Sequence, residues 1–293
     1  MALPAQVVAL LLTEHRREAF AGPVLAYGRQ RLDFTYDGAL WMLESLGLTP
    51  HPDGTADRPP ADACIDLRRL VKLLGLGELA VLEAPAAEGI DIVADLNDPV
   101  PADLAGRFGL IVDGGALESV FDIRQGMKNT AAMLRPGGRI VHVAPVNNYV
   151  NRGYVQRSPT FYHDFYVENG FDDVRGIMMV QPRSRTPGQR WNMFRYDHVA
   201  LGGVNSMFCP ADTQLGIYFT ARKNAASTTD RIPVQSYFTR VYDGMDALPG
   251  QYVVTHDPAR LDVRQVSDPE PRAGAVVLFS PIWSLRGDAA GAS

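Results

Sequence analysis

Four short apolar runs lie between Glu78 and Pro145, and each is apolar throughout rather than alternating with polar residues. They are Leu79–Leu82, Ile90–Ala94, Leu110–Val112 and Ile140–Val143. Short runs of this kind are typical of strands that are buried on both faces, as in a parallel sheet. The stretch therefore predicts the centre of a parallel β-sheet.

Segments with helical spacing of apolar residues lie before and between these runs. We expect helices over residues 3–20, 37–46, 66–74 and 117–134. Arg135-Pro136-Gly137-Gly138 predicts the end of the last of these, and Ser158-Pro159 predicts the start of another helix that ends at Gly170. Further strands are expected at Val24–Gln30, Val174–Val180 and Gly216–Thr220. This alternation of strands and helices predicts a doubly wound α/β fold with a mostly parallel sheet.

Two segments interrupt this alternation. Residues 181–213 form a long insertion with several aromatic side chains, and loops of that length are usually functional or disordered. From Asn224 the chain is rich in Pro, Asp and Arg, with strand-like pieces at Tyr252–Thr255 and Ala275–Ser280. We therefore predict one α/β domain over residues 1–223, with an insertion at about 181–213, and a C-terminal extension over 224–293.

Composition narrows the classes of function. The chain has 293 residues and a net charge of −5, which does not favour nucleic acid or an anionic membrane as a partner. No apolar run approaches the roughly 20 residues of a membrane-spanning helix. The two cysteines, Cys64 and Cys209, are far apart in sequence, so neither a disulfide framework nor a cysteine-based zinc site is expected. We expect a cytoplasmic protein that acts on a small molecule, and a homo-oligomer stays an open alternative.

Three of the four apolar runs end at an acidic residue. These residues are Glu83, Asp95 and Asp113. Because ligands of open parallel sheets bind at the carboxyl ends of the strands, the three carboxylates are expected along one edge, where a nucleotide-like ligand would lie.

The same region resembles the central part of class I S-adenosylmethionine-dependent methyltransferases. Leu134-Arg135-Pro136-Gly137-Gly138 matches the most recognisable phrase of that family, and Leu117-Glu118-Ser119-Val120 resembles a segment often written Leu-Glu-His-Val, with serine replacing histidine. The resemblance covers roughly residues 20–223. It implies S-adenosyl-L-methionine as the cofactor and methyl transfer to a small polar or hydroxylated metabolite, such as a sugar or a natural-product intermediate.

The resemblance also assigns roles to individual residues. Glu83 would bind the ribose hydroxyls, since one ionised carboxylate can accept hydrogen bonds from both hydroxyls of a vicinal diol. Asp95, Leu96 and Asn97 would bracket the adenine. Asp113 would lie near the methyl-transfer centre, with Gly114, Gly115 and Glu118 beside it on the cofactor side. The alternatives are a surface carboxylate at Glu83, an Asp-capped turn at Asp95, a tight glycine turn after Asp113 and a first-turn helix anion at Glu118.

The glycine-rich loop departs from the family pattern. After the first strand the family has an acidic residue and Gly-x-Gly-x-Gly, whereas this chain has Tyr27-Gly28-Arg29-Gln30. Three outcomes stay open. These four residues bind the cofactor in a modified way, the chain binds a different nucleotide, or it keeps the fold and has lost methyl transfer.

On the substrate side, polar and aromatic residues follow the fifth strand. They are Asn147, Asn148, Tyr149, Arg152 and Tyr154, and their amides and phenols suit a hydroxylated or sugar-like molecule. The alternative is a structural loop that satisfies its own backbone. Asp113 and His163 are the candidate catalytic residues, and His163, on the helix after Pro159, would reach the cleft as a base. His198, on the insertion, is a second candidate base, whereas His142 lies in a buried run and is expected to be a core residue. No group of His, Asp and Glu has metal-ligand spacing, so no metal site is predicted.

Two other functions compete with methyl transfer. The first is a methyltransferase-like fold that carries out other chemistry, such as that of a cyclase or isomerase, or that binds the cofactor without turnover. The incomplete glycine loop and the serine at position 119, Ser119, agree with this alternative. A nicotinamide dehydrogenase is disfavoured, because no Gly-x-Gly-x-x-Gly follows the first strand.

Overall fold

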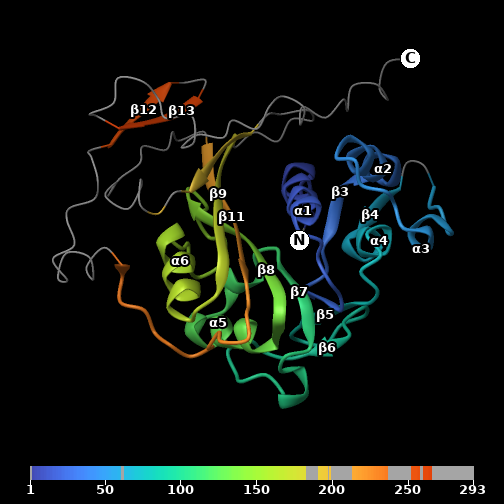
Figure 1. The fold of residues 1–293 in the computed structure, drawn as a ribbon, viewed down its shortest axis with the longest axis horizontal. Helices are drawn as coiled ribbons and strands as arrows, with labels where there is room; N and C mark the ends of the chain where they lie inside the picture. Colours follow the sequence, from blue (N-terminus) through green and yellow to red (C-terminus); the bar gives the residue numbers. More distant parts are fainter. Residues whose placement is uncertain are drawn as a thin grey trace.

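A computed structural model describes residues 2–60, 63–182, 191–196, 198 and 213–236, together with strands at 252–257 and 260–265 (Figure 1). Its centre is an eight-stranded sheet of order β10-β9-β11-β8-β7-β2-β5-β6. The strands are β2 (Val24–Tyr27), β5 (Leu79–Glu83), β6 (Ile92–Val93), β7 (Phe108–Asp113), β8 (Leu134–Asn147), β9 (Asp172–Pro182), β10 (Asn192–Tyr196) and β11 (Thr213–Arg222).

The order of the parallel strands confirms the predicted doubly wound α/β fold. Strands β6, β5, β2, β7 and β8 pair in parallel, while β11 runs antiparallel between β8 and β9, and β10 is an antiparallel edge. Counted along the chain, the five parallel strands have the order 3-2-1-4-5, as in dinucleotide-binding folds. The direction of winding changes between β2 and β7, so this fold offers its ligand crevice beyond the carboxyl ends of those two strands.

Helices cover both faces of the sheet (Figure 1). They are α1 (Ala5–Arg17), α2 (Tyr36–Ser45), α3 (Pro52–Thr55), α4 (Leu67–Leu73), α5 (Ile123–Met133) and α6 (Pro159–Glu168), with 3-10 turns at Ala102–Leu104 and Ala116–Ser119. Alternate residues of β2 enter two different cores, as the pleat of a strand requires. Val24 and Ala26 belong to the cluster with α1, α2 and α4, and Leu25 and Tyr27 belong to the cluster with α5 and α6.

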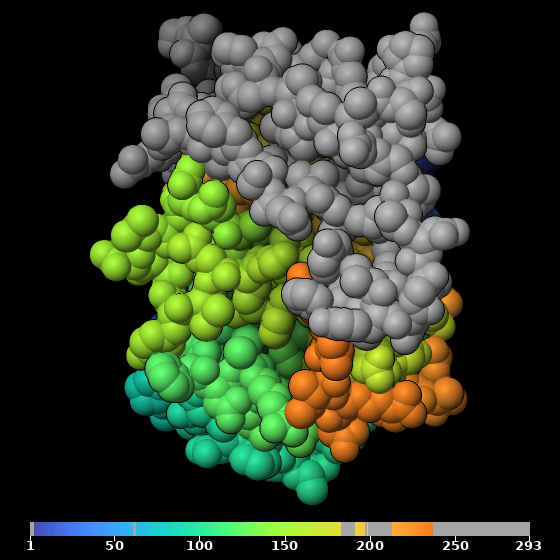
Figure 2. All heavy atoms as spheres, turned by 90° about the vertical axis from the view of Figure 1, so that its left-hand side faces the viewer, coloured from blue at the N-terminus to red at the C-terminus, as the bar shows by residue number. Residues whose placement is uncertain are grey.

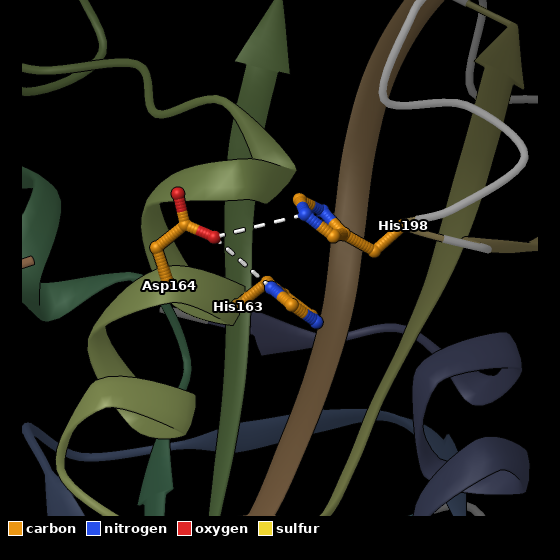
Figure 3. A group of neighbouring side chains, drawn as sticks. All are labelled: His163, Asp164 and His198. Carbon is orange, nitrogen blue, oxygen red and sulfur yellow. Dashed lines mark hydrogen bonds and ion pairs between the residues drawn. The ribbon is translucent and has the colours of Figure 1, made fainter. Parts of the chain in front are cut away.

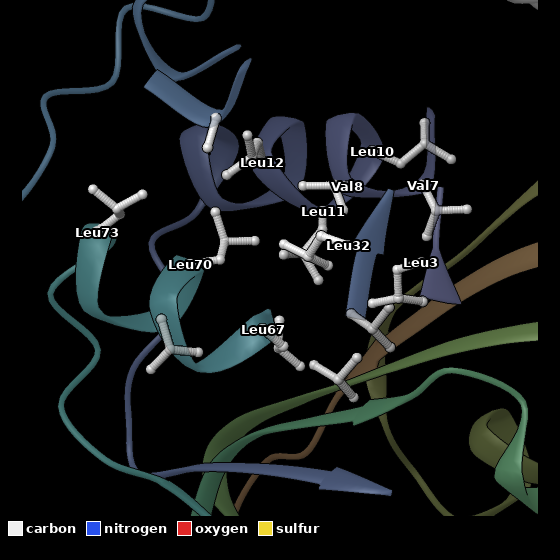
Figure 4. Packing of buried hydrophobic residues seen from close by; sticks show 14 of the residues in the cluster. Leu3, Val7, Val8, Leu10, Leu11, Leu12, Leu32, Leu67, Leu70 and Leu73 are labelled. Carbon is white, nitrogen blue, oxygen red and sulfur yellow. The ribbon is translucent and has the colours of Figure 1, made fainter. Parts of the chain in front are cut away.

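A second, small sheet lies beside the first cluster, and the sequence did not predict it. It consists of β1 (Ala2–Leu3), β3 (Arg31–Thr35) and β4 (Cys64–Asp66). Figure 4 shows Leu32 of β3 packed between leucines of α1 and α4. Because β3 begins at Arg31, directly after the turn that follows β2, the small sheet continues the wall of the crevice.

Several predicted boundaries differ from the structure. The helix expected over 117–134 begins only at Ile123, where the Asp122 side chain accepts a hydrogen bond from the Gln125 N–H at 3.0 Å. The Arg135–Gly138 phrase forms the first part of β8 rather than a separate turn, and Gly137 has a φ of 80° there. The strand expected at Ile90–Ala94 shortens to the two residues of β6.

The insertion and the extension are described in part. The insertion contains β10, and the strand predicted at Tyr252–Thr255 is present as β12 (Tyr252–Asp257), paired with β13 (Arg260–Gln265). Cys209, the strand predicted at Ala275–Ser280 and most of the insertion lie outside the described residues. Within the described part of the chain, no helix has the length and apolar character needed to cross a bilayer.

Candidate functional site

A cavity of about 1220 Å³ opens at the point where the winding of the sheet reverses. Its wall combines the turn after β2, the end of β5, the loop after β6 and the turn after β7, and the small sheet extends it on one side. Ligand cavities usually measure about 300–1,000 Å³, so this one has room for a nucleotide-sized cofactor and a second small molecule.

Glu83 ends β5 and contributes a carboxylate to the cavity wall. Its Oε2 atom is buried and has no hydrogen-bond partner among the described residues. Gly28 lies opposite, close enough that a Cβ atom there would be 3.8 Å from the carboxyl carbon. Since a buried polar atom without a partner is unfavourable, Oε2 is an acceptor that a bound ligand can satisfy.

The turn Tyr27–Gln30 lines the cavity with all four of its residues, although it lacks the family's glycine pattern. Gly28 has a φ of +70°, which favours glycine, and its N–H donates to the Leu82 carbonyl at 2.8 Å. The Gln30 side chain is only 5% exposed, and its Nε2 donates to the Tyr27 carbonyl at 2.7 Å. Its Oε1 is buried without a partner among the described residues, so the turn offers a second acceptor.

The Tyr27 phenol points away from this acceptor. Its Oη lies 2.8 Å from Thr130 Oγ1 on α5, and the ring is 1% exposed. Burial raises the pKa of Tyr27 far above its usual value. The phenol therefore anchors the turn to α5 and stays protonated.

Asp95, Leu96 and Asn97 also line the cavity. Asp95 Oδ1 accepts hydrogen bonds from the backbone N–H and the side-chain amide of Asn97, at 2.9 and 2.7 Å. These two bonds lower the pKa of Asp95. Asp95 therefore caps a turn and also lines the cavity. Leu96 adds an apolar side chain that is 6% exposed.

Asp113 differs from its expected position at the reacting centre. It is 0% exposed and does not line the cavity. Its Oδ1 accepts from the N–H groups of Gly115, Ala116 and Leu117 at 3.0, 2.8 and 3.3 Å, and its Oδ2 lies 2.8 Å from His142 Nδ1. Asp113 therefore acts through the turn that it holds, in which Gly115, at a φ of 109°, and Ala116 reach the cavity.

The charge of Asp113 is set by opposing effects. Burial raises its pKa, but the hydrogen bond with His142, the charge of Arg157 and the backbone donor of Gly115 outweigh burial and lower it. His142 is a core histidine, as predicted, and burial lowers its pKa. Its Nε2 lies 2.6 Å from the Tyr166 hydroxyl, so a neutral ring that donates from Nδ1 and accepts at Nε2 satisfies both partners.

Gly114 and Glu118 are not part of the cavity wall either. Gly114 lies behind Gln30, where an added Cβ atom would be 2.5 Å from the Gln30 Oε1. Glu118 is 1% exposed, accepts a hydrogen bond from Arg152 Nε at 2.9 Å, and has its pKa raised by burial. Glu118 thus binds the loop after β8 instead of the cavity contents.

The five residues predicted to bind substrate form that loop, and none of them lines the cavity. Asn147 Oδ1 accepts from the Asn148 N–H, and Asn148 Nδ2 donates to the Thr213 carbonyl. The Arg152 guanidinium stacks over Tyr149 at 5.1 Å, so much of the loop satisfies its own polar groups. Tyr154 is 70% exposed and packs edge-on against Phe121, which follows the cavity residue Val120.

His163 lies on α6 outside the cavity wall, so the structure does not place it as a base in the cleft. Its ring stacks on that of His198, with 3.7 Å between the ring centroids. The structure instead brings residues to the cavity that sequence reasoning passed over: Arg31, Asp33, Cys64, Asp66, Arg68 and Ser119. Only Ser119 carried a signal, because it stands at the histidine position of the family segment.

Comparisons with known proteins give structural likeness only. No protein-family model matches the chain, and no curated protein matches its sequence. Among solved structures, the chain is similar to the CMeT domain of the citrinin polyketide synthase, with 10% identity, a TM-score of 0.36, and coverage of 69% of this chain and 46% of that one. The chain thus spans about half of the length of that structure.

Two other similar structures come from bacteria and archaea. Precorrin-6y C5,15-methyltransferase from Geobacter metallireducens has 13% identity and a TM-score of 0.37, covering 74% of this chain and 88% of that one. A SAM-dependent methyltransferase from Archaeoglobus fulgidus has 15% identity and a TM-score of 0.38, and the match covers 73% of this chain and 93% of that one.

Proposed function

We propose that this protein binds S-adenosylmethionine and transfers its methyl group to a small polar or hydroxylated molecule. The observation that carries the proposal is the buried Oε2 of Glu83, which lies in the cavity at the strand ends and has no hydrogen-bond partner in the described part of the chain. A carboxylate in that position accepts both hydroxyls of a ribose with charge-assisted strength.

The surrounding residues fit the rest of the cofactor. The unpartnered Oε1 of Gln30 would accept a hydrogen bond from the ammonium of the amino-acid end. Leu96, on the loop after β6, would pack against the adenine, with Asp95 and Asn97 at its polar edge. The bound cofactor supplies an electrophilic methyl group on a sulfonium, and the protein holds donor and acceptor in line.

The acceptor molecule has its own part of the cavity in this proposal. Arg31, Asp33 and Asp66, on the small sheet, line the cavity beyond the cofactor-binding turn. Charged groups of both signs suit a polar, hydrogen-bonding acceptor. Asp33 is the carboxylate we propose as the base where the nucleophile is an alcohol, in place of Asp113 and His163, which lie outside the cavity wall.

Calorimetric titration with S-adenosylhomocysteine tests the cofactor assignment. We expect saturable binding to the wild-type chain and a loss of roughly 10- to 100-fold in affinity for Glu83→Gln, because hydrogen bonds to a charged group contribute about 1.5–3 kcal/mol. Glu78→Gln is the matched control, since Glu78 is exposed just before the first residue of the same strand. Equal affinity of Glu83→Gln and wild type would refute the assignment.

A second function is favoured by the burial of Asp113 and the position of His163. If Asp33 does not act as a base, the chain would bind the cofactor without methyl transfer to a hydroxyl group. Incubation with methyl-labelled S-adenosylmethionine and a panel of hydroxylated acceptors separates the two: labelled product supports methyl transfer, and Glu83-dependent binding with no product supports the second function.

A further inference from the structure

A cluster of two histidines and an aspartate lies beside α6, and none of its residues lines the large cavity. His163 and Asp164 come from α6, and His198 follows β10. One ligand atom from each residue lies within 4.8 Å of the other two. Figure 3 shows both imidazoles directed at the Asp164 carboxylate. We propose that these three residues bind a divalent transition-metal ion, with zinc as the best match to the donors.

The distances suit the coordination of zinc. His163 Nδ1 lies 3.1 Å from Asp164 Oδ1, and His198 Nε2 lies 3.8 Å from the same oxygen. Bonds of about 2.0 Å in a tetrahedral zinc site put neighbouring ligand atoms about 3.3 Å apart. The two imidazoles are stacked, so the rings turn out of their parallel arrangement when the in-plane lone pairs of His163 Nδ1 and His198 Nε2 bind one ion.

The neighbours of the cluster hold its donors in position, as outer partners of metal ligands do. His198 Nδ1 lies 3.0 Å from the Tyr196 hydroxyl, which leaves Nε2 as the ligand atom. Asp164 Oδ2 accepts a hydrogen bond from the Ser236 N–H at 2.9 Å, which leaves Oδ1 facing the histidines. The Asp164 and His198 side chains are 6% and 8% exposed, so their geometry is fixed by packing.

Among the described residues this group has three ligands, which leaves one position of a tetrahedral zinc ion for water. The His163 side chain is 23% exposed, so water reaches the cluster and completes the coordination. The Ser236 hydroxyl lies 2.7 Å from His198 Nε2. Zinc at Nε2 replaces that hydrogen bond and leaves the hydroxyl beside the metal-bound water.

The ion would join three segments that are distant in sequence. It links α6 to the residue after β10. Through Asp164, which accepts a hydrogen bond from Ser236, it also links α6 to the chain that follows β11, drawn in orange in Figure 2. None of the three ligands lines the large cavity. The site is therefore separate from the cavity, and it stands whether or not the cavity carries out methyl transfer.

Zinc titration of the chelator-treated full-length chain tests the proposal. We expect one zinc per chain, a higher Tm with zinc, and affinity that falls by at least roughly tenfold in His163→Gln and in His198→Gln. His51→Gln is the matched control, since His51 Nδ1 lies 3.6 Å from Asp53 Oδ2 on the surface but the pair belongs to no three-ligand group among the described residues. It should bind zinc as the wild type does.

Cobalt in place of zinc identifies the ligands independently. Bands of a nitrogen- and oxygen-ligated cobalt ion, without thiolate charge transfer, support the histidine site over the exposed Cys64. Circular dichroism checks that the variants fold. Absence of zinc binding by the wild type, thiolate bands with cobalt, or wild-type affinity in the folded His163→Gln/His198→Gln double variant would overturn the proposal.

Discussion

The Asp113 carboxylate lies 2.8 Å from His142 Nδ1, and both side chains are completely buried at neighbouring positions of β7 and β8. This pair holds the turn after β7 in place, where Asp113 also accepts three backbone hydrogen bonds. Removing one partner leaves the other polar group buried without compensation. We predict that Asp113→Ala lowers the free energy of unfolding by roughly 3–5 kcal/mol, measured by urea denaturation. A loss near zero would contradict this structural role.

The same pair predicts a loss of stability in acid. The pKa of His142 in the folded protein is below the ordinary 6.5. As the pH falls below 6.5, the unfolded chain therefore binds more protons than the folded protein does. The contribution of His142 is therefore complete above pH 6.5 and declines on acidification, and that of Asp113 declines only below 3.8. His15, whose pKa burial also lowers, acts in the same direction.

Urea denaturation of the wild type and of His142→Gln across this pH range isolates the contribution of His142 to the free energy of unfolding. We expect the unfolding free energy of wild type to fall more steeply than that of His142→Gln as the pH drops below 6.5. Since His15 is present in both proteins, the difference between them reports His142. Parallel curves would contradict a buried neutral histidine.

Because Gly114 and Gln30 are in contact, we predict that substitutions at the two positions have non-additive effects on cofactor binding. A Cβ atom at Gly114 would lie 2.5 Å from the Gln30 Oε1 and would displace the side-chain amide. Because displacing that buried amide breaks its hydrogen bond to the Tyr27 carbonyl, Gly114→Ala should cost roughly 1–3 kcal/mol in stability. It should weaken binding of S-adenosylhomocysteine by about tenfold, and no further loss should follow in a Gln30→Ala background. Additive losses in the calorimetric cycle would show that Gly114 acts independently of Gln30.

Glu118 is a buried carboxylate whose removal should be tolerated. Burial raises its pKa above the ordinary 4.5 despite the contact with Arg152, so folding disfavours its charged form relative to the unfolded chain. Glu118→Gln keeps the shape and the acceptor for Arg152 while removing the charge. We predict an unfolding free energy that is unchanged or higher by up to about 1 kcal/mol near neutral pH. The exposed Glu88→Gln serves as the reference, and a loss of about 2 kcal/mol or more relative to it would reverse this conclusion.

Much of the fold follows from patterns that are local in sequence. The apolar runs at β5, β7 and β8 and the Ser158-Pro159 start of α6 predicted their elements, because burial on both faces and helix capping leave strong local signals. The small sheet was missed because its strands have only two to five residues, although Arg31 and Asp33 alternate with apolar positions as in a half-buried strand. Such short pieces become strands only through pairing with distant segments.

The candidate site likewise contains residues that the sequence predicted and residues that it did not. Glu83 and Asp95 reach the cavity because their strands are parallel neighbours, which the sequence pattern implied. Asp113 turned inward because His142, on the next strand, and the N–H groups of its own turn take up its oxygens, and strand-end position does not reveal such partners. The residues of β4 and the cluster of His163, Asp164 and His198 depend on tertiary packing alone.

The central claim is that Glu83 binds the hydroxyls of a ribose, and a calorimetric cycle tests it most directly. S-adenosylhomocysteine and its 2′-deoxy analogue are titrated into wild type and Glu83→Gln. The account predicts that wild type loses roughly tenfold or more in affinity for the deoxy analogue, while Glu83→Gln binds the two ligands nearly alike. An equal loss in both proteins would place the ribose elsewhere and contradict the claim.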